Sequence, residues 1–418
     1  MGIKQDITKL CVRAKSAYQE ACGISSEVKN EALRSMASAL RKRAPMILAA
    51  NRKDLANAKK KKLSAAMIDR LTLDSKRIGQ MADSLDEIAQ LPDPVNEVMK
   101  AWRRPNGLWI HKVRVPIGLI AIIYEARPNV TSDCAGLCFK AGNSVILRGG
   151  SEAHYSNTAI HAVINAVMEG SGMPSGMVSM IPTVDRAAVN ELLKLNELVD
   201  LVIPRGGEAL IRKVTELSRI PVIKHYKGIC HVFVDEWADL NMAQEICFNA
   251  KVQRPGVCNA MESMLVHKDC AQRFLPGMLK KFSAAGVEIR GCPVTRKIFK
   301  AARKATETDY HTEYLDLKLS VKVVDGIDQA IRHINAYGSH HSDSIVTENY
   351  DNALRFLRGV DSACVYVNAS TRFTDGNQFG MGAEIGISTD KLHARGPMAL
   401  EELTTYKYMI FGSGQIRK

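Results

Sequence analysis

The order of apolar and polar residues predicts a helical opening segment, a β-hairpin and a buried strand. From about residue 5 to residue 91, apolar residues recur at helical spacing, with Ser25 and Ser26 as expected helix caps. Between residues 108 and 123 the pattern changes to alternation and then to an unbroken apolar run. Alternation is typical of a half-buried strand, and a short apolar run is typical of a fully buried one. We therefore expect a hairpin that leads into a buried strand.

Beyond this strand, short apolar stretches alternate with stretches of helical periodicity in two series. The first series comprises residues 144–147, 153–168, 177–181, 189–195, 198–203 and 208–217. The second comprises residues 230–234, 262–266, 320–324, 325–337 and 363–368. Strands that alternate with helices of this length form right-handed crossover units on a parallel sheet. The sequence thus predicts two α/β domains in tandem, with a boundary near residues 227–231.

Length and composition agree with a two-domain protein of the cytosol. At 418 residues the chain exceeds what one hydrophobic core usually serves, and its 46% hydrophobic and 24% charged residues are ordinary globular values. No uninterrupted apolar stretch reaches the roughly 18 residues of a membrane span, and Lys4, Asp6 and Lys9 argue against a signal peptide. The ten dispersed cysteines fit a reducing compartment. We expect a cytoplasmic protein with no membrane partner.

Neither the charge nor the cysteines indicate nucleic acid or metal. The net charge of +13 attracts anions in general, but residues 59–62, the densest cluster, lack interleaved aromatic residues that stack on bases. A solvated helix end is therefore favoured over a nucleic-acid site. Cys134 and Cys138 could share a metal from one helix, but no His or further Cys stands near enough in sequence to complete the set. We expect neither a metal nor a nucleic-acid partner.

Candidate chemistry begins at residues 249–262, which place Cys258 between a helix and the next strand. Pro255 and Gly256 force a turn there. A thiol beside such a turn, with Lys251 and Arg254 close by in sequence, has the setting of a nucleophile, because positive charge favours the thiolate. Taken alone, however, a cysteine near a turn is more often structural than catalytic.

A second candidate, Asn129, follows the buried strand. Within the segment 115–131, the buried strand ends in Arg-Pro-Asn, at the carboxyl end of a sheet, where ligands of open α/β folds bind. The amide of Asn129 could donate to a developing oxyanion. It could equally cap the helix that follows. The sequence at this point leaves the two alternatives even.

These two segments, together with residues 142–153, resemble the γ-glutamyl phosphate reductase family within the aldehyde dehydrogenase superfamily. Residues 373–397 and 401–408 resemble the same family, so the likeness covers essentially the whole chain. The resemblance implies an aldehyde dehydrogenase-like α/β fold, with a Rossmann-like cofactor domain, an α/β catalytic domain and a small β flap for oligomerisation. By position, these are residues 1–102 with 117–228, residues 229–390, and residues 103–116 with 400–418.

The resemblance also implies that Cys258 is the nucleophile and that Asn129 helps to bind the oxyanion. One departure from the hydrolytic members of the superfamily is informative. Those enzymes carry a water-activating glutamate in a Glu-Leu-Gly-Gly-Lys motif, whereas residues 225–228 here are His-Tyr-Lys-Gly. Without this base, a thioester survives until hydride arrives. His225 could itself act as a base, although a structural role is at least as well supported.

Cofactor contacts follow from the same resemblance. Arg148 stands where the superfamily places a cation, and its guanidinium suits a 2′-phosphate, which favours NADPH. Arg205, Gly206 and Gly207 precede a helix whose N–H groups could receive the pyrophosphate, with a turn that requires glycine as the even alternative. Glu313 resembles the glutamate that holds the nicotinamide ribose; its alternative is a surface carboxylate.

The implied reaction is the NADPH-dependent reduction of L-glutamyl 5-phosphate to L-glutamate 5-semialdehyde and phosphate through a Cys258 thioester, in proline biosynthesis. The substrate anions require cations, and Arg127, Arg254 and Arg395 are candidates, although each could form a structural ion pair instead. Predicted partners are the substrate, further copies of the chain in a dimer or tetramer, and glutamate 5-kinase in a transient contact. A thioester-hydrolysing aldehyde dehydrogenase and a non-catalytic protein of the same fold are the alternatives.

Overall fold

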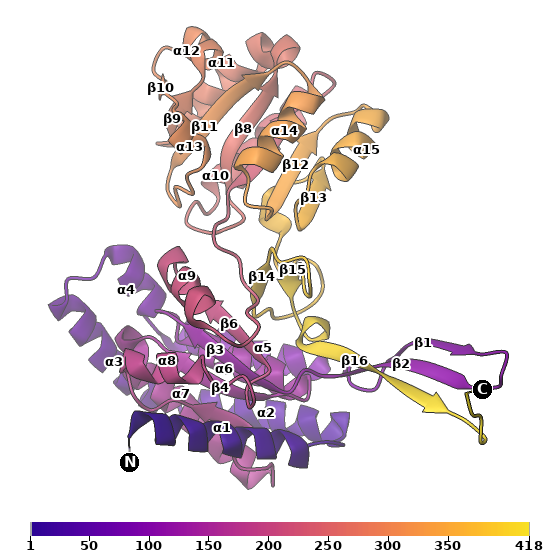
Figure 1. Ribbon diagram of the computed structural model, residues 1–418. Coiled ribbons are helices and arrows are strands. Elements are labelled where there is room, and N and C mark those ends of the chain that lie inside the picture. The colour runs from indigo at the N-terminus through magenta and orange to yellow at the C-terminus, as the bar shows by residue number, and fades with distance from the viewer. Residues whose placement is uncertain (1, 418) are drawn as a thin grey trace. The chain divides into compact units, whose positions relative to one another are not determined.

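The computed structural model describes residues 2–417, apart from the side chains at positions 65 and 66, and it divides into two compact units (Figure 1). Unit 1 comprises the described residues up to Lys224 together with Gly380–Gly386 and the residues from Met398 onward. Unit 2 comprises His225–Phe379 and Ile387–Pro397. The predicted boundaries, at residues 228 and 390, differ from these limits, because the chain leaves unit 1 at Lys224 and returns to it at Gly380.

The opening segment of unit 1 is helical, as predicted. Its helices are α1 (Ile3–Glu20), α2 (Ser26–Lys42), α3 (Ala44–Lys60), α4 (Ala65–Leu71) and α5 (Ser75–Gln90). The hydroxyl of Ser25 caps α2 by accepting the N–H of Val28 at 3.4 Å. Ser26, the second expected cap, lies inside the helix instead, and its hydroxyl donates to Asp93 at 2.8 Å.

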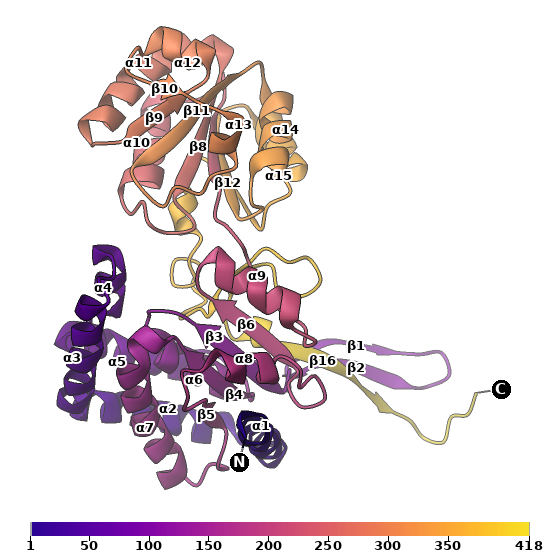
Figure 2. The same cartoon turned by 60° about the vertical axis from the view of Figure 1, so that its left-hand side comes forward.

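A parallel sheet forms the core of unit 1. Its strands lie in the order β5 (Val178–Met180), β4 (Ser144–Gly149), β3 (Leu119–Tyr124) and β6 (Leu201–Arg205). The connecting helices are α6 (Asn129–Lys140), α7 (His154–Gly170), α8 (Arg186–Leu192) and α9 (Glu208–Leu217). β3 is buried at every position, which explains its unbroken apolar run. Ile7 and Cys11 of α1 pack on one face of the sheet with Leu119 and Ile123, and Figure 2 shows α1 end-on.

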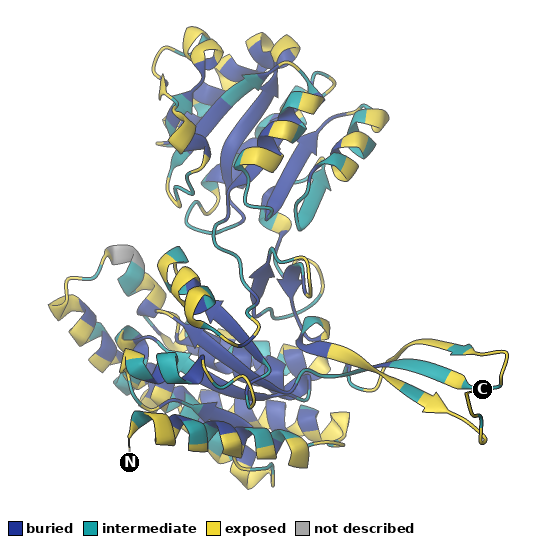
Figure 3. Cartoon of the chain, in the orientation of Figure 1, coloured by how far each residue is buried: buried dark blue, intermediate teal, exposed yellow. Residues whose placement is uncertain are grey.

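A small antiparallel sheet extends from unit 1. The strands β1 (Val98–Arg103), β2 (Trp109–Pro116) and β16 (Thr404–Phe411) pair in that order, with Thr404 opposite Pro116 and Phe411 opposite Trp109. The predicted hairpin is confirmed, and its first strand begins before the predicted start at residue 103. Figure 3 shows that much of this sheet is exposed in the single chain.

A larger parallel sheet forms the core of unit 2. Its strands lie in the order β10 (Arg303–Lys304), β9 (Glu288–Gly291), β11 (Lys318–Val324), β8 (Met261–His267), β7 (Cys230–Val234), β12 (Ser342–Val346) and β13 (Cys364–Val367). Its helices are α10 (Leu240–Val252), α11 (Lys268–Ala284), α12 (Pro293–Ile298), α13 (Glu307–Tyr310), α14 (Ile327–Tyr337) and α15 (Tyr350–Gly359). The predicted strands near residues 230, 262, 320 and 363 are confirmed; β9, β10 and β12 were not predicted. The short strands β14 (Gly386–Ser388) and β15 (Gly396–Met398) pair with each other.

Candidate active site

Cys258 lies in unit 2, in the loop that joins α10 to β8, as the sequence predicted. This loop consists of turns, and Cys258 is half-buried in it. Because β8 begins immediately after the loop and lies inside a parallel sheet, Cys258 stands at the amino-terminal edge of that sheet. The start of a central strand therefore fixes one end of the loop.

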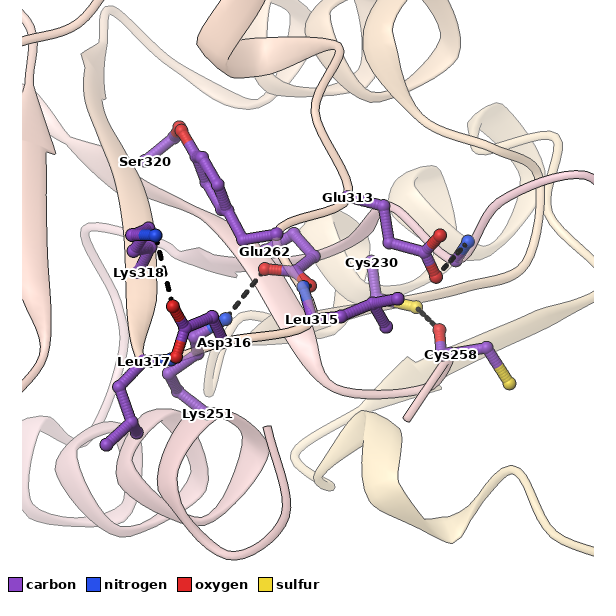
Figure 4. Close-up of polar contacts among 12 residues, drawn as sticks. Cys230, Lys251, Cys258, Glu262, Glu313, Leu315, Asp316, Leu317, Lys318 and Ser320 are labelled. Atoms are coloured by element: carbon purple, nitrogen blue, oxygen red, sulfur yellow. Dashed lines mark hydrogen bonds and ion pairs between the residues drawn. The ribbon is translucent and has the colours of Figure 1, made fainter. Parts of the chain in front are cut away.

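Two residues at the start of β7 hold the backbone of Cys258. Gly228 lies so close that a Cβ atom there would come within 2.0 Å of the Cys258 carbonyl oxygen, so this approach requires glycine. Cys230 donates its S–H to the same oxygen, with a sulfur–oxygen distance of 3.2 Å (Figure 4). Burial raises the pKa of the Cys230 thiol well above its usual range. Cys230 therefore remains a protonated donor.

Glu313 also lies at this edge of the sheet, in the segment between α13 and β11. Its Oε1 accepts the N–H of Gly228 at 2.9 Å. Glu313 is half-buried, so it is not a simple surface carboxylate. The ring of His225 lies edge-on to that of His341, with ring centroids 5.7 Å apart. The structure thus brings Glu313 and Cys258 into contact with the same glycine.

Two guanidinium groups lie beside the Cys258 loop. Arg254 is exposed within it, and Arg372 donates its Nε–H to Gln253 at 2.8 Å and also bonds the side chain of Asn259. Burial lowers the pKa of Arg372, and the positive charge of Arg254 lowers it further. Among the residues that the structure describes, no carboxylate forms an ion pair with either. Arg372 is not among the predicted residues, because it lies far from Cys258 along the chain.

The cations near Cys258 in sequence have different surroundings in the structure. Lys251 does not support the thiolate as expected, because it is fully buried and its Nζ lies 2.6 Å from Glu262. Arg395 forms the structural ion pair that was its alternative, with its Nη2 2.8 Å from Asp361. Hydrogen bonds from Lys391 and then Arg395 lower the pKa of Asp361 to about 2.

Asn129 lies in unit 1, as the first residue of α6, beyond the carboxyl end of β3. Its side chain makes no capping bond, so the helix-cap alternative is wrong. Instead, Nδ2 donates to Asp133 at 2.9 Å from an exposed position. The second Nδ2 hydrogen has no acceptor among the described residues, which leaves it available to a ligand. Arg127 is exposed in the turn before α6.

A pocket of about 270 Å³ opens in unit 1 at the carboxyl ends of β3 and β4 and beside α8 and α9. Three cations line it, namely Arg148, Arg186 and Lys213. Arg148 donates from Nη2 to the Val184 carbonyl at 3.0 Å, while its buried Nε has no hydrogen-bond partner in the described part of the chain. Burial lowers the pKa of Arg148. An anionic ligand would satisfy this group.

The amino terminus of α9 already holds a carboxylate. Gly207 is its N-cap, and its N–H donates to Glu125 Oε2 at 2.9 Å. A Cβ atom at Gly206 would lie 2.3 Å from the same oxygen. The site therefore attracts an anion, as helix N-termini do. The side chain of Arg205 lies against the backbone of Gly386 instead and does not line the pocket.

Comparisons with known proteins agree along the whole chain. The aldehyde dehydrogenase family matches residues 2–293. A gamma-glutamyl phosphate reductase of Thermodesulfovibrio yellowstonii is 57% identical over 418 residues, which is 100% of both chains. The crystal structure of gamma-glutamyl phosphate reductase from Thermotoga maritima has a TM-score of 0.97 and 47% identity, covering 99% of this chain and 100% of that one. The chain belongs to the γ-glutamyl phosphate reductases of the aldehyde dehydrogenase family.

The aldehyde dehydrogenase-like fold predicted from the sequence is therefore confirmed, including the separate antiparallel sheet. A solved structure of much lower identity has a similar fold: an engineered glycolyl-CoA reductase with bound NADP⁺ has a TM-score of 0.68 at 13% identity, covering 96% of both chains. No helix in residues 2–417 is both long and apolar enough to cross a membrane.

No local pattern in the sequence points to some of the polar groups near the site. Glu262 and Arg372 make their contacts only after folding. Within residues 2–417, the one group of His, Cys, Asp or Glu close enough to share a metal comprises Glu236, His267 and Asp269. Cys134 and Cys138 are not part of it, and burial raises the pKa of both thiols.

Proposed function

We propose that this enzyme reduces L-glutamyl 5-phosphate to L-glutamate 5-semialdehyde and phosphate with NADPH, in proline biosynthesis. The observation that carries the proposal is the 57% identity over the whole chain with a gamma-glutamyl phosphate reductase. The half-buried Cys258 at a strand start, and the absence of the water-activating glutamate at residues 225–228, support the reductive course of the reaction.

In the proposed mechanism, the Cys258 thiolate attacks the acyl carbon, and Asn129 and the Cys258 backbone N–H donate to the developing oxyanion. Phosphate then leaves with the electron pair of its C–O bond, which yields a thioester. Bound NADPH supplies the hydride that reduces this thioester. The carbon–sulfur bond of the resulting hemithioacetal breaks, Cys258 recovers the electron pair as thiolate, and the aldehyde is released.

The residues of the unit 1 pocket fit a phosphorylated dinucleotide. The unpartnered Nε of Arg148 and the cations Arg186 and Lys213 suit a 2′-phosphate. The N–H of Gly207, at the amino terminus of α9 and bonded to the pocket residue Glu125, suits the pyrophosphate once Glu125 moves away. Glu313, which belongs to unit 2, remains a sequence-based prediction for the nicotinamide ribose. The NADP⁺ bound by the glycolyl-CoA reductase of similar fold is consistent with this assignment.

For the substrate anions, the structure favours Arg254 among the three predicted arginines and adds Arg372. Both lie beside the Cys258 loop without an ion-pair partner among the described residues, whereas Arg395 is paired with Asp361. We expect Arg254→Gln to raise the KM for phosphate about tenfold, the value of one charge-assisted hydrogen bond. Arg127 remains a prediction from the sequence.

The test of the proposed function follows NADPH formation from glutamate 5-semialdehyde, NADP⁺ and phosphate. Wild type should require phosphate, and Cys258→Ala should lose activity by at least about a thousandfold, because the covalent step is lost. Cys22→Ala, which replaces an exposed cysteine of unit 1, serves as the control and should retain full activity. Activity without phosphate would support the thioester-hydrolysing alternative, and undiminished activity of Cys258→Ala would contradict the mechanism.

The small antiparallel sheet supports the predicted oligomer. β16 exposes Tyr406, Tyr408, Ile410 and Phe411. Exposed apolar side chains on an extended sheet are typical of a protein–protein interface. We propose that this sheet packs against another copy of the chain, and light scattering of Tyr408→Glu should show a smaller particle than wild type. The transient contact with glutamate 5-kinase and the cytoplasmic location remain predictions.

A further inference from the structure

We propose that Lys251 and Glu262 form a positioning pair that holds the Cys258 loop in register with the segment carrying Glu313. The inference rests on the proposed function, in which Cys258 forms the thioester and Glu313 holds the hydride donor. Neither member of the pair would touch the substrate. The pair would act by fixing the distance between the Cys258 thioester, which is reduced, and the hydride donor held by Glu313.

The pair closes the two ends of the Cys258 loop. Lys251 lies at the end of α10 and Glu262 at the start of β8, and the loop between them contains Cys258. Their side chains are 0% and 1% exposed, and Nζ lies 2.6 Å from Oε2 (Figure 4). A buried ion pair contributes little net stability compared with apolar residues of the same size. Its presence beside a nucleophile therefore indicates a role in geometry.

The second oxygen of Glu262 reaches the Glu313 segment. Oε1 accepts the N–H of Leu315 at 3.0 Å. Leu315 has a φ of +52°, in the left-handed region that residues other than Gly and Asn rarely adopt. Such a conformation persists only where surrounding contacts determine it. Glu262 thus bonds a backbone turn two residues beyond Glu313 and helps to hold it.

A ring of contacts connects the two segments. Glu262 bonds Leu315, Glu313 accepts the N–H of Gly228, and Gly228 packs directly on the backbone of Cys258. The fourth link is covalent, since the chain runs directly from Cys258 to Glu262 at the start of β8. A displacement at one point of this ring moves the others, because the contacts at Gly228 and Cys258 are between backbones. Loss of the Glu262 carboxylate would therefore displace Glu313 relative to Cys258.

Ionisation gives the pair a measurable signature. Burial raises the pKa of Glu262 to about 7 and lowers the pKa of Lys251. The other titratable groups that face the pair are Glu313, Asp316, Cys230 and Tyr314. As pH falls through about 7, Glu262 gains a proton and its hold on Lys251 weakens. The kcat/KM for NADPH should therefore decrease as pH falls below about 7, and we call this decrease the acid limb.

The experiment compares wild type with Glu262→Gln, which keeps an acceptor for Leu315 but removes the charge. We expect the KM for NADPH to rise about tenfold and kcat to fall about tenfold, and the acid limb near pH 7 to disappear. The rate of Cys258 alkylation by iodoacetamide should change less than threefold, because the substitution does not alter the thiol itself. Glu245→Gln is the matched control: it removes an exposed ion pair of the same 2.6 Å length from α10 and should match wild type.

A second variant keeps the proposal testable if Glu262→Gln does not fold. In Lys251→Gln combined with Glu262→Gln, two amides replace the two charges and can still bond each other. This double variant should recover the wild-type KM for NADPH but lack the acid limb. Unchanged KM, kcat and pH profile in both variants, or an acid limb that persists in the double variant, would overturn the positioning role. A wild type without phosphate-dependent activity would instead overturn the proposed function.

Discussion

In unit 1 the candidate residues follow the carboxyl ends of strands, whereas in unit 2 they precede the amino ends. Asn129 comes after β3 and Gly206 after β6, while Cys258 comes just before β8 and Glu313 before β11. Ligands of open parallel sheets normally bind at the carboxyl edge, where helix N-termini present free N–H groups. Unit 1 follows this rule and unit 2 does not.

The difference lies in what holds each site. In unit 1 the candidate ligand groups are the Gly207 N–H and the Asn129 side chain, beyond strand ends, together with the three cations that line the pocket. In unit 2 no helix N-terminus serves Cys258, and its loop is fixed by buried side chains such as Glu262 and by one glycine. A site built from strand–helix turns tolerates substitution of surrounding side chains. A site held by buried polar contacts should not.

The largest expected effect tests whether the unit 1 edge takes part in the chemistry. Asn129→Ala should lower kcat by about 10²–10³, the usual loss for one oxyanion donor. Because Asn129 is exposed and caps nothing, the loss of its hydrogen bond to Asp133 should cost only about 1 kcal/mol of stability. Steady-state kinetics with a melting curve measure both. Normal kcat in Asn129→Ala would confine the chemistry to unit 2.

The sequence predicted most of the strands and the position of two unit 1 candidates beyond strand ends, but not β9, β10, β12 or the pocket cations Arg186 and Lys213. Apolar runs such as β3 predict buried parallel strands, and a general rule then places Asn129 and Gly206 at the carboxyl edge. The unit 2 site does not follow from any such rule. Its contacts join residues such as Arg372 and Asn259, which are distant in sequence, so no local pattern shows that they meet.

The second-largest expected effect concerns Gly228, whose close approach to the backbone of Cys258 helps to fix the Cys258 loop. Gly228→Ala should lower kcat about 100-fold, because its Cβ would meet the backbone of Cys258 and move the nucleophile by a fraction of an ångström or more. Overpacking should also cost about 1–3 kcal/mol of stability. Kinetics and chemical denaturation give the two values.

Two glycines of unit 1 provide matched controls for Gly228. In Gly206→Ala the new Cβ meets only the Glu125 carboxylate and a leucine side chain, so we expect a higher KM for NADPH with kcat preserved. In Gly79→Ala, inside α5, the Cβ has open space, and kinetics should match wild type. Equal losses of kcat in Gly206→Ala and Gly228→Ala would remove the contrast between the two sites.

A smaller effect concerns cofactor choice at the unit 1 edge. Arg148→Gln should raise the KM for NADPH by about 10–100-fold, since hydrogen bonds to charged groups contribute about 1.5–3 kcal/mol. The KM for NADH should barely change, because NADH lacks the 2′-phosphate. The KM of Arg148→Lys for NADPH should lie between those of wild type and Arg148→Gln, because lysine offers a point charge without the bidentate geometry of a guanidinium. A parallel rise for both cofactors would show that Arg148 serves another part of the dinucleotide.

The sequence also gave no indication of how polar the interior of unit 2 is. His231, His333 and Asp343 are all buried around its sheet, and His231 lies 2.9 Å from Asp343. Helical periodicity places His333 on the inner face of α14, but periodicity alone cannot show which groups surround it. Those surroundings decide its ionisation, and only the assembled fold brings them together.

The smallest expected effect tests whether this polar interior makes unit 2 sensitive to acid. Burial first, then the charges of His231, Lys322 and His311, lower the pKa of His333 from 6.5 to about 2. Below pH 6.5 the unfolded chain therefore binds a proton that the folded chain refuses, so stability falls as pH falls, by about 1.4 kcal/mol per pH unit. His333→Phe keeps the stacking on Tyr337, whose ring centroid lies 4.4 Å away, and abolishes this proton uptake.

The free energy of unfolding of wild type minus that of His333→Phe should consequently decrease as pH is lowered from 7 to 5, whichever protein is the more stable at pH 7. Hydrogen exchange of the α14 amides at each pH measures this stability difference locally, so the two units need not unfold together. His333→Gln is a second comparison, since it also cannot take up a proton but loses the stacking. If the difference in unfolding free energy stays constant between pH 7 and pH 5, the pKa of His333 is not lowered in the folded protein, and His333 does not make unit 2 sensitive to acid.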